Sequence, residues 1–280
     1  MKLLVTGAAG MLGRDVANAA TVAGHELTAL GHAELDIGDP EAVEAAVREA
    51  RPDAVLNCAA WTDVDGAQTR SREAFAVNGP GAGTVARAAA DAGAWVVHVS
   101  TDYVFSGEKR SPYLESDATG PRSEYGRGKL AGELAVAQAA PRAHTIVRSS
   151  WLFGTGGPCF PATILRAGSA RDQLTVVEDQ VGCPTFTGHL APALLALAQD
   201  PIEGIVHVAG GGQCSWYDFS REIVSLAGLG CEVVPGATAD LGRPAPRPAY
   251  SVLGTERNGT PRLPDWHDGL QDFLAAGVPS

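Results

Sequence analysis

The segment KLLVTGAAGMLG, residues 2–13, runs from an apolar stretch into a turn rich in glycine. Lys2–Thr6 is predicted to form a strand, and a helix is predicted to follow the turn. Gly7, Gly10 and Gly13 recur at every third position. This spacing permits a tight turn that brings a helix N-terminus and backbone N–H groups close to a pyrophosphate. The segment therefore predicts a nucleotide-binding turn, with a purely structural turn as the alternative in a chain of 34 glycines.

Further apolar runs extend this pattern through the first half of the chain. Helical patterns separate them, and one helix is expected to begin at Asp39-Pro40, where aspartate suits the N-cap and proline the first helical position. Apolar strands that alternate with helices are typical of a parallel sheet covered on both faces. The sequence thus predicts an α/β fold with a Rossmann-like doubly wound parallel sheet. The other expected strands are His25–Leu30, Ala54–Cys58, Trp95–Ser100 and Thr145–Ser149, and a long alanine-rich helix is expected to end near Gly93.

The pattern loosens after about residue 150, where glycine and proline cluster at 154–161. This half is too interrupted for a second complete sheet domain. We expect residues 1–150 to form an NAD(P)-binding domain and residues 151–280 to form mainly a smaller C-terminal substrate-binding lobe, with a later segment returning to the first domain. Helices are predicted at 161–170, 190–199, 216–229 and 266–275, with a proline-rich loop at 242–248.

The composition excludes several classes of partner. The 280 residues include 32 acidic and 21 basic side chains, a formal charge of −11, which argues against nucleic acid or an anionic membrane surface. No apolar run approaches the roughly 18 residues that a membrane span needs. The five cysteines form no CxxC pair, so free thiols are expected rather than disulfides or a metal site. The protein is expected to be soluble and cytoplasmic.

The end of the second predicted strand leaves the choice between NADH and NADPH open. An acidic residue there would bind the adenosine 2′-hydroxyl of NADH. The strand ends in Leu30-Gly31-His32, and the nearest carboxylates, Glu34 and Asp36, follow slightly later. No arginine stands at this strand tip to favour the 2′-phosphate of NADPH, and Arg14 is the one candidate to reach it.

Tyr125 and Lys129 form a Tyr-x-x-x-Lys pair in a chain that has five tyrosines and only three lysines. Residues four apart share one face of a helix. A lysine ammonium beside a phenol is expected to lower the phenol's pKa, so that Tyr125 exchanges protons near neutral pH. An exposed aromatic–lysine pair without chemistry is the alternative.

A hydroxyl group is expected at the carboxyl end of the fourth predicted strand. Thr101 follows Ser100 there, where ligands bind in open parallel sheets. Its hydroxyl is expected to bond a substrate carbonyl or the phenol of Tyr125, unless it only caps the following loop.

Taken together, these segments resemble the extended short-chain dehydrogenase/reductase superfamily and, within it, the dTDP-4-dehydrorhamnose reductase family, over nearly the whole chain. The motifs that carry the resemblance are the glycine turn, Asn57–Asp65, Ser100–Phe105, Tyr125–Lys129 with Gly132-Glu133, Arg148–Trp151, Asp179–Thr185, and Arg247-Pro248 followed by Ser251 and Leu253.

The resemblance implies site residues for NADPH, with NADH also accepted, and for a dTDP-sugar. Trp61 departs from the histidine or tyrosine expected at its position. The implied cofactor residues are Gly7, Gly10, Met11, Leu12, Gly13, Asp36, Ile37, Ala59, Ala60, Trp61, Tyr125 and Lys129. The implied substrate residues are Thr101, Asp102, Tyr103, Trp151 and Arg247, with Arg243 as a second candidate for the diphosphate.

The implied reaction is reduction of the C4 ketone of a dTDP-6-deoxy-4-ketohexose to dTDP-L-rhamnose or a related sugar. Tyr125 would supply the proton, Lys129 would tune it and Thr101 would polarise the carbonyl. A sugar-nucleotide dehydratase is disfavoured because Tyr103 stands where that class carries a glutamate. An epimerase and a non-catalytic regulatory subunit stay as further alternatives. No metal is expected, and the protein is expected to be a monomer or a homodimer.

Overall fold

The computed structural model describes residues 1–277 and is built on a six-stranded sheet. All neighbouring strands of this sheet run parallel, in the order β10-β5-β4-β3-β1-β2. The predicted Rossmann-like α/β fold is confirmed. The strands are β1 (Lys2–Thr6), β2 (Glu26–Leu30), β3 (Ala54–Asn57), β4 (Trp95–Thr101), β5 (His144–Ser149) and β10 (Gly204–His207).

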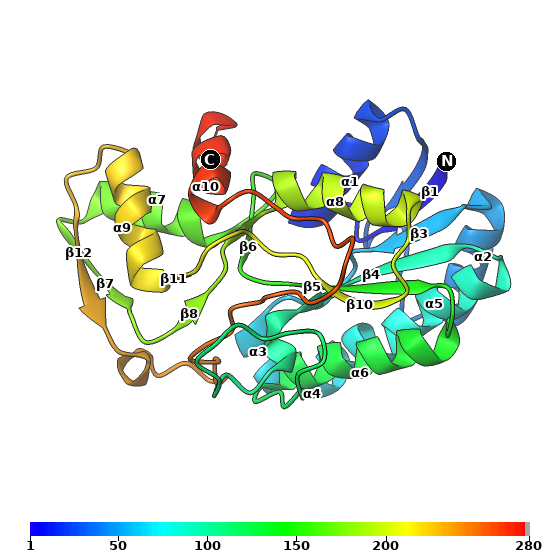
Figure 1. Cartoon of the computed structure of the whole chain (residues 1–280), viewed down its shortest axis with the longest axis horizontal. Coiled ribbons are helices and arrows are strands. Elements are labelled where there is room, and N and C mark those ends of the chain that lie inside the picture. The colour runs from blue at the N-terminus through cyan, green and yellow to red at the C-terminus, as the bar shows by residue number, and fades with distance from the viewer. Residues whose placement is uncertain (278–280) are drawn as a thin grey trace.

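Helices cover both faces of the sheet, as its apolar strands require. On one face α1 (Met11–Val22) and α8 (Thr187–Gln199) lie side by side, and their apolar residues share a core with β1, β3 and β4 (Figure 1). On the other face α2 (Pro40–Ala50), α5 (Ala82–Asp91) and α6 (Glu124–Ala139) form a second core with the same sheet. Asp39 caps α2, since its side chain accepts hydrogen bonds from two backbone N–H groups, and Pro40 follows as expected.

The segment between β3 and β4 differs from the prediction of one long helix. It contains α3 (Val64–Thr69), α4 (Ser71–Ala76), the π-helical turn η1 (Val77–Gly81) and α5. Pro80 lies inside η1 and has no N–H to donate, which explains why regular α-helical bonding is interrupted there.

The second half forms a smaller lobe beside the carboxyl ends of the strands and also returns to the sheet through α8 and β10 (Figure 1). This lobe has its own core, in which aromatic side chains such as Phe153, Phe219 and Phe273 meet. Among residues 1–277, the sheets of this lobe have two strands each. Its elements are β6 (Leu152–Phe153), α7 (Phe160–Ala170), β7 (Gln173–Val177), β8 (Val181–Gly182), β9 (Thr185–Phe186), β11 (Cys214–Ser215), α9 (Trp216–Leu226), β12 (Glu232–Gly236), η3 (Thr238–Leu241) and α10 (Trp266–Ala275).

Residues 242–254 run between the lobe and the sheet, and we call them the strap (drawn in orange in Figure 1). On the lobe side, the N–H of Ser251 donates to the carbonyl oxygen of Val181 across 2.8 Å. On the sheet side, the strap residue Val252 accepts a bond from the N–H of Tyr113 at 2.8 Å. The strap therefore joins the two parts of the molecule next to the strand ends.

No helix within residues 1–277 is long and apolar enough to cross a membrane. All five cysteines are free thiols, as predicted.

Candidate active site

Steric limits shape the glycine turn after β1. Gly7 has a φ of +67°, and a Cβ there would lie 2.6 Å from the backbone nitrogen of Ala59. A Cβ on Gly13 would lie 2.2 Å from the carbonyl oxygen of Gly7, whereas the nearest neighbour of a Cβ on Gly10 would be 3.2 Å away. The turn therefore packs directly against the loop that follows β3 and presents bare backbone at the strand ends.

The N-terminus of α1 is open to a ligand. No side chain within residues 1–277 caps it, so N–H groups in its first turn, at Met11, Leu12 and Gly13, stay available together with the helix's partial positive charge. The Nε atom of Arg14 donates to the carbonyl oxygen of Ala9 across 2.9 Å, which holds this arginine on the turn. The open helix terminus and the bare turn fit a dinucleotide pyrophosphate; the individual contacts stay a prediction.

A carboxylate lies at the tip of β2 after all. Glu34 folds back, and its Oε2 atom accepts a hydrogen bond from the N–H of Gly31 at 2.9 Å. A Cβ on Gly31 would lie 2.8 Å from the Cβ of Ala9, so this tip touches the glycine turn. Asp36 is exposed, while Ile37 is buried in the core beneath α2 and α5, so an adenine contact from Ile37 would use its backbone.

Asn57, the last residue of β3, is hydrogen-bonded to both neighbouring strands, β1 and β4. Its Oδ1 atom accepts the hydroxyl of Thr6 at 2.7 Å and the N–H of Ala59 at 3.2 Å, and its Nδ2 atom lies 3.1 Å from Nδ1 of His98. These bonds fix the start of the loop that holds Ala59 and Ala60, both predicted to face the cofactor. Asn57 belongs to the Asn57–Asp65 motif, but its role in the site was not predicted.

Trp61 is held through its backbone. The buried amide of Asn78 accepts the N–H of Trp61 at 2.8 Å and donates to its carbonyl oxygen at 3.0 Å. The indole N–H donates to the carbonyl oxygen of Asp63, and the guanidinium of Arg70 lies 4.4 Å over the ring. The indole thus packs against its own loop. Asn78 was missed because it lies 17 residues from Trp61, in a turn whose π-helical form was not predicted.

Tyr125 and Lys129 lie one turn apart on α6. The Ser123 hydroxyl caps this helix by accepting the N–H of Gly126 at 3.1 Å. Lys129 is buried, and its Nζ atom donates to the carbonyl oxygen of Val99 on β4 at 2.7 Å. Burial lowers the pKa of Lys129 to about 8. The predicted shared helix face is confirmed, and it places the lysine at the end of β4.

The predicted direction of the Tyr125 pKa is wrong in this structure. Burial raises the pKa of Tyr125 to about 12, while a hydrogen bond with the hydroxyl of Thr101 acts the other way. The Lys129 ammonium is directed at a backbone carbonyl, so its charge does not offset the cost of burying a phenolate. A raised pKa keeps the phenol protonated, which suits a proton donor.

Thr101, the last residue of β4, lies between the phenol of Tyr125 and the buried carboxyl group of Asp102. Its hydroxyl accepts the N–H of Tyr103 at 3.2 Å and donates to Oδ1 of Asp102 at 3.0 Å, in the short helix η2 (Asp102–Val104). Burial raises the pKa of Asp102 to about 7, and the hydrogen bond from the Thr101 hydroxyl acts in the opposite direction. The Tyr103 ring meets the Tyr125 ring edge-on at 5.6 Å. The structure thus brings Thr101, Asp102, Tyr103 and Tyr125 together.

Trp151 stands just beyond the end of β5 with a φ of +47°. Its indole stacks on that of Trp216, and a Cβ on Gly182 would come within 2.4 Å of the Trp151 ring. The glycine of the Asp179–Thr185 motif is therefore needed to make room for this tryptophan.

Arg247 was predicted to bind a diphosphate, but its guanidinium is engaged by a carboxylate. Its NH1 and NH2 atoms donate to the two oxygens of Asp65 at 2.6 and 2.9 Å. Arg243 makes one contact with the same carboxylate, at 3.3 Å.

A buried ion pair lies behind the site and was not predicted. Arg148 on β5 donates to both oxygens of Glu133 on α6, at 2.9 and 2.7 Å, and Ser100 donates to the same carboxylate at 2.5 Å. The pair fixes α6 against β5, and the Ser100 bond fixes α6 against β4, the strand that carries Thr101. Glu133 lies four residues after Lys129, so both side chains share one face of α6. This spacing was the local signal that the Glu133 carboxylate is buried against the sheet.

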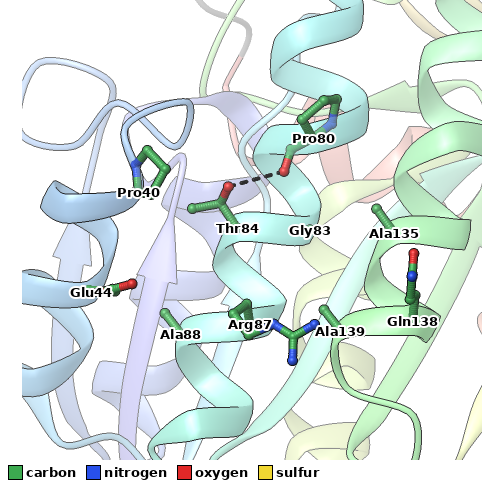
Figure 2. Close-up of a pocket in the computed structure, with 10 residues that line it drawn as sticks. All are labelled: Pro40, Glu44, Pro80, Gly83, Thr84, Arg87, Ala88, Ala135, Gln138 and Ala139. Atoms are coloured by element: carbon green, nitrogen blue, oxygen red, sulfur yellow. Dashed lines mark hydrogen bonds between the residues drawn. The ribbon is translucent and has the colours of Figure 1, made fainter.

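A separate hollow of about 320 Å³ is lined by residues of α2, η1, α5 and α6 (Figure 2). Its lining combines small residues such as Gly83 and Ala135 with the longer polar side chains of Glu44, Arg87 and Gln138, and none of these residues belongs to the site described above. Within residues 1–277, no cluster of three histidine, cysteine or acidic side chains could hold a metal ion.

Comparison with known proteins identifies close relatives. A family model described as "RmlD substrate binding domain" matches residues 1–278. A protein of Streptomyces antibioticus named "Probable dTDP-4,6-dihydroxy-2-methyloxan-3-one 4-ketoreductase" is 43% identical, over 100% of this chain and 98% of its own. The dTDP-4-dehydrorhamnose reductase of Mycolicibacterium smegmatis is also 43% identical, over 99% of this chain and 86% of its own.

A solved structure of similar fold was determined with a cofactor. It is dTDP-4-dehydrorhamnose reductase from Bacillus anthracis in complex with NADP, 35% identical, with a TM-score of 0.95 over 99% of this chain and 100% of that chain.

Proposed function

Because the chain belongs to the RmlD substrate-binding-domain family, whose members include dTDP-4-dehydrorhamnose reductases, we propose that it is an NAD(P)H-dependent oxidoreductase acting on a dTDP-sugar. It reduces the C4 ketone of a dTDP-6-deoxy-4-ketohexose. One observation carries the proposal: the phenol of Tyr125 lies beside the hydroxyl of Thr101 at the carboxyl end of β4, with Lys129 buried on the same helix.

NADPH is the cofactor that we propose, with NADH also accepted. The bare glycine turn and the uncapped N-terminus of α1 would hold its pyrophosphate, and the loop at Ala59, Ala60 and Trp61 would line its nicotinamide side. Asp36 and Ile37 would flank its adenine, and Lys129 and Tyr125 would meet its nicotinamide ribose. When bound, the cofactor supplies the hydride.

Tyr125 donates the proton that the reduced carbonyl oxygen needs. Its raised pKa keeps the proton on the phenol at neutral pH until negative charge develops on the substrate oxygen. Thr101 orients that oxygen with its hydroxyl, which the neighbouring Asp102 carboxyl holds at 3.0 Å. Lys129, buried one turn further along α6, would hold the nicotinamide ribose beside the phenol rather than lower the pKa of Tyr125.

The sugar and its nucleotide would lie between the strand ends and the lobe, in contact with Thr101, Asp102, Tyr103 and Trp151. dTDP-4-dehydro-L-rhamnose, which would yield dTDP-L-rhamnose, is the first substrate to test. Another 4-keto-6-deoxyhexose is the second candidate, because the Streptomyces antibioticus relative is named for a different 4-ketoreduction. We expect the enzyme to work in the cytoplasm as a monomer or homodimer.

Turnover of a panel of dTDP-4-keto sugars with NADPH tests this function. The wild-type protein should oxidise NADPH only when a 4-keto sugar nucleotide is present. Tyr125→Phe should lower kcat by roughly 10²- to 10⁴-fold while NADPH still binds. Undiminished turnover by Tyr125→Phe would show that another group is the acid. A wild-type protein that binds NADPH but oxidises it with no sugar of the panel would support a binding subunit instead.

A further inference from the structure

Asp65 binds the strap at three of its residues. Its carboxylate accepts the bidentate guanidinium of Arg247, one bond from Arg243 and the backbone N–H of Ala245 at 3.2 Å. The NH1 atom of Arg247 also donates to the carbonyl oxygen of Ala245 at 2.7 Å, so the strap is folded around the carboxylate. These bonds join α3 of the first half to a segment about 180 residues away in the chain.

This part of the strap borders the proposed substrate site. A Cβ on Gly107 would lie 2.6 Å from the Cα of Pro248, so the residue after Arg247 packs against the loop that follows η2. The charges of Arg247 and Arg243 both act on the phenol of Tyr103, whose ring contacts that of Tyr125. A displacement of the strap would therefore alter the wall next to the proton donor.

The two arginines of the strap are not equivalent. The side chain of Arg247 is 10% exposed and both of its terminal nitrogens are engaged, whereas that of Arg243 is 54% exposed and, within residues 1–277, makes a single ion-pair contact, at 3.3 Å. One carboxylate faces two guanidinium groups, which leaves one positive charge in excess among these three side chains. A guanidinium with free N–H groups matches phosphate oxygens.

We propose that Asp65 is a positioning residue of the substrate site: it anchors the strap through Arg247 and thereby directs Arg243 to the diphosphate of the sugar nucleotide. The inference rests on the proposed function, because it takes a nucleoside diphosphate sugar as the ligand. In this proposal Arg247 holds the strap in place and Arg243 binds the ligand.

Direct binding of dTDP and dTMP tests the assignment without any turnover. Arg243→Ala should weaken dTDP binding about tenfold and dTMP binding much less, because a charge-assisted bond to the second phosphate is lost. Arg48→Ala, at an exposed arginine on α2, is the control and should change neither affinity. Equal losses for dTDP and dTMP, or no loss, would show that Arg243 does not bind the second phosphate.

The positioning by Asp65 is tested by a double-mutant cycle with Asp65→Asn, which keeps the shape of the side chain. If Asp65 directs Arg243, the tenfold effect of Arg243→Ala on dTDP binding should shrink to less than about threefold in the Asp65→Asn background. An undiminished effect would overturn the positioning role. Both variants should retain NADPH binding, which reports an intact first domain. Since dTDP binding needs no reaction, failure of wild-type turnover would count against the proposed function and leave this test standing.

Discussion

The indole rings of Trp151 and Trp216 lie parallel within 3°, with their centroids 3.5 Å apart. Trp151 takes a positive φ to reach this position, which is costly for a bulky residue. The stack connects the end of β5 to the start of α9. The two stacked rings therefore border the region in which we propose that the sugar nucleotide binds.

Gly182→Ala should disturb this stack. The added methyl would come within 2.4 Å of the Trp151 ring, so the ring must move, and we expect a loss of roughly 1–3 kcal/mol in the free energy of unfolding. KM for the sugar nucleotide should rise, and the near-UV circular dichroism of the tryptophans should change. Gly230→Ala, where a Cβ meets no atom within 4 Å, is the matched control in the same lobe. A variant at Gly182 with an unchanged tryptophan signal would contradict the assignment.

Glu34→Gln should shift the cofactor preference toward NADPH. The Glu34 carboxylate lies on the N–H of Gly31 at the tip of β2, where it would repel a 2′-phosphate and accept a 2′-hydroxyl. Glutamine keeps the acceptor and removes the charge, so KM for NADPH should fall about 3- to 10-fold relative to KM for NADH. Glu49→Gln, at an exposed glutamate on α2, controls for net charge. An unchanged ratio of the two KM values would place the ribose elsewhere.

Much of the fold could be read from local sequence, because its signals span few residues. The glycine turn and the Tyr125–Lys129 pair are defined by spacings of three and four residues, and both predictions of local structure hold. The bond between Asp65 and Arg247 joins residues 182 apart in the chain, so no local pattern could reveal it. The direction of the Tyr125 pKa also failed, since spacing indicates a shared helix face but not that the Lys129 ammonium points to Val99.

Asp102→Asn should change how stability depends on pH. Burial raises the pKa of Asp102 from 3.8 to about 7 in the folded protein. Between these values the unfolded chain loses the proton while the folded protein keeps it, so the free energy of unfolding falls as the pH rises through this window. The fall attributable to this group is at most about 4 kcal/mol.

Urea unfolding at about pH 4.5 and about pH 8 measures this dependence. The free energy of unfolding should differ less between the two pH values in Asp102→Asn than in the wild type. Asp91→Asn, at an exposed aspartate, is the control and should keep more of the wild-type difference. If the two variants keep the same dependence as the wild type, the Asp102 carboxyl is not held in its protonated form.

Hydride transfer to C4 is tested most directly by the fate of deuterium. The protein is incubated with NADPH carrying deuterium at the transferable position and with dTDP-4-dehydro-L-rhamnose, and the product is examined by NMR. Hydride transfer to C4 predicts a dTDP-6-deoxyhexose with deuterium at C4 and nowhere else on the sugar. A wild-type product without deuterium at C4, or no product from any 4-keto sugar nucleotide, would contradict it.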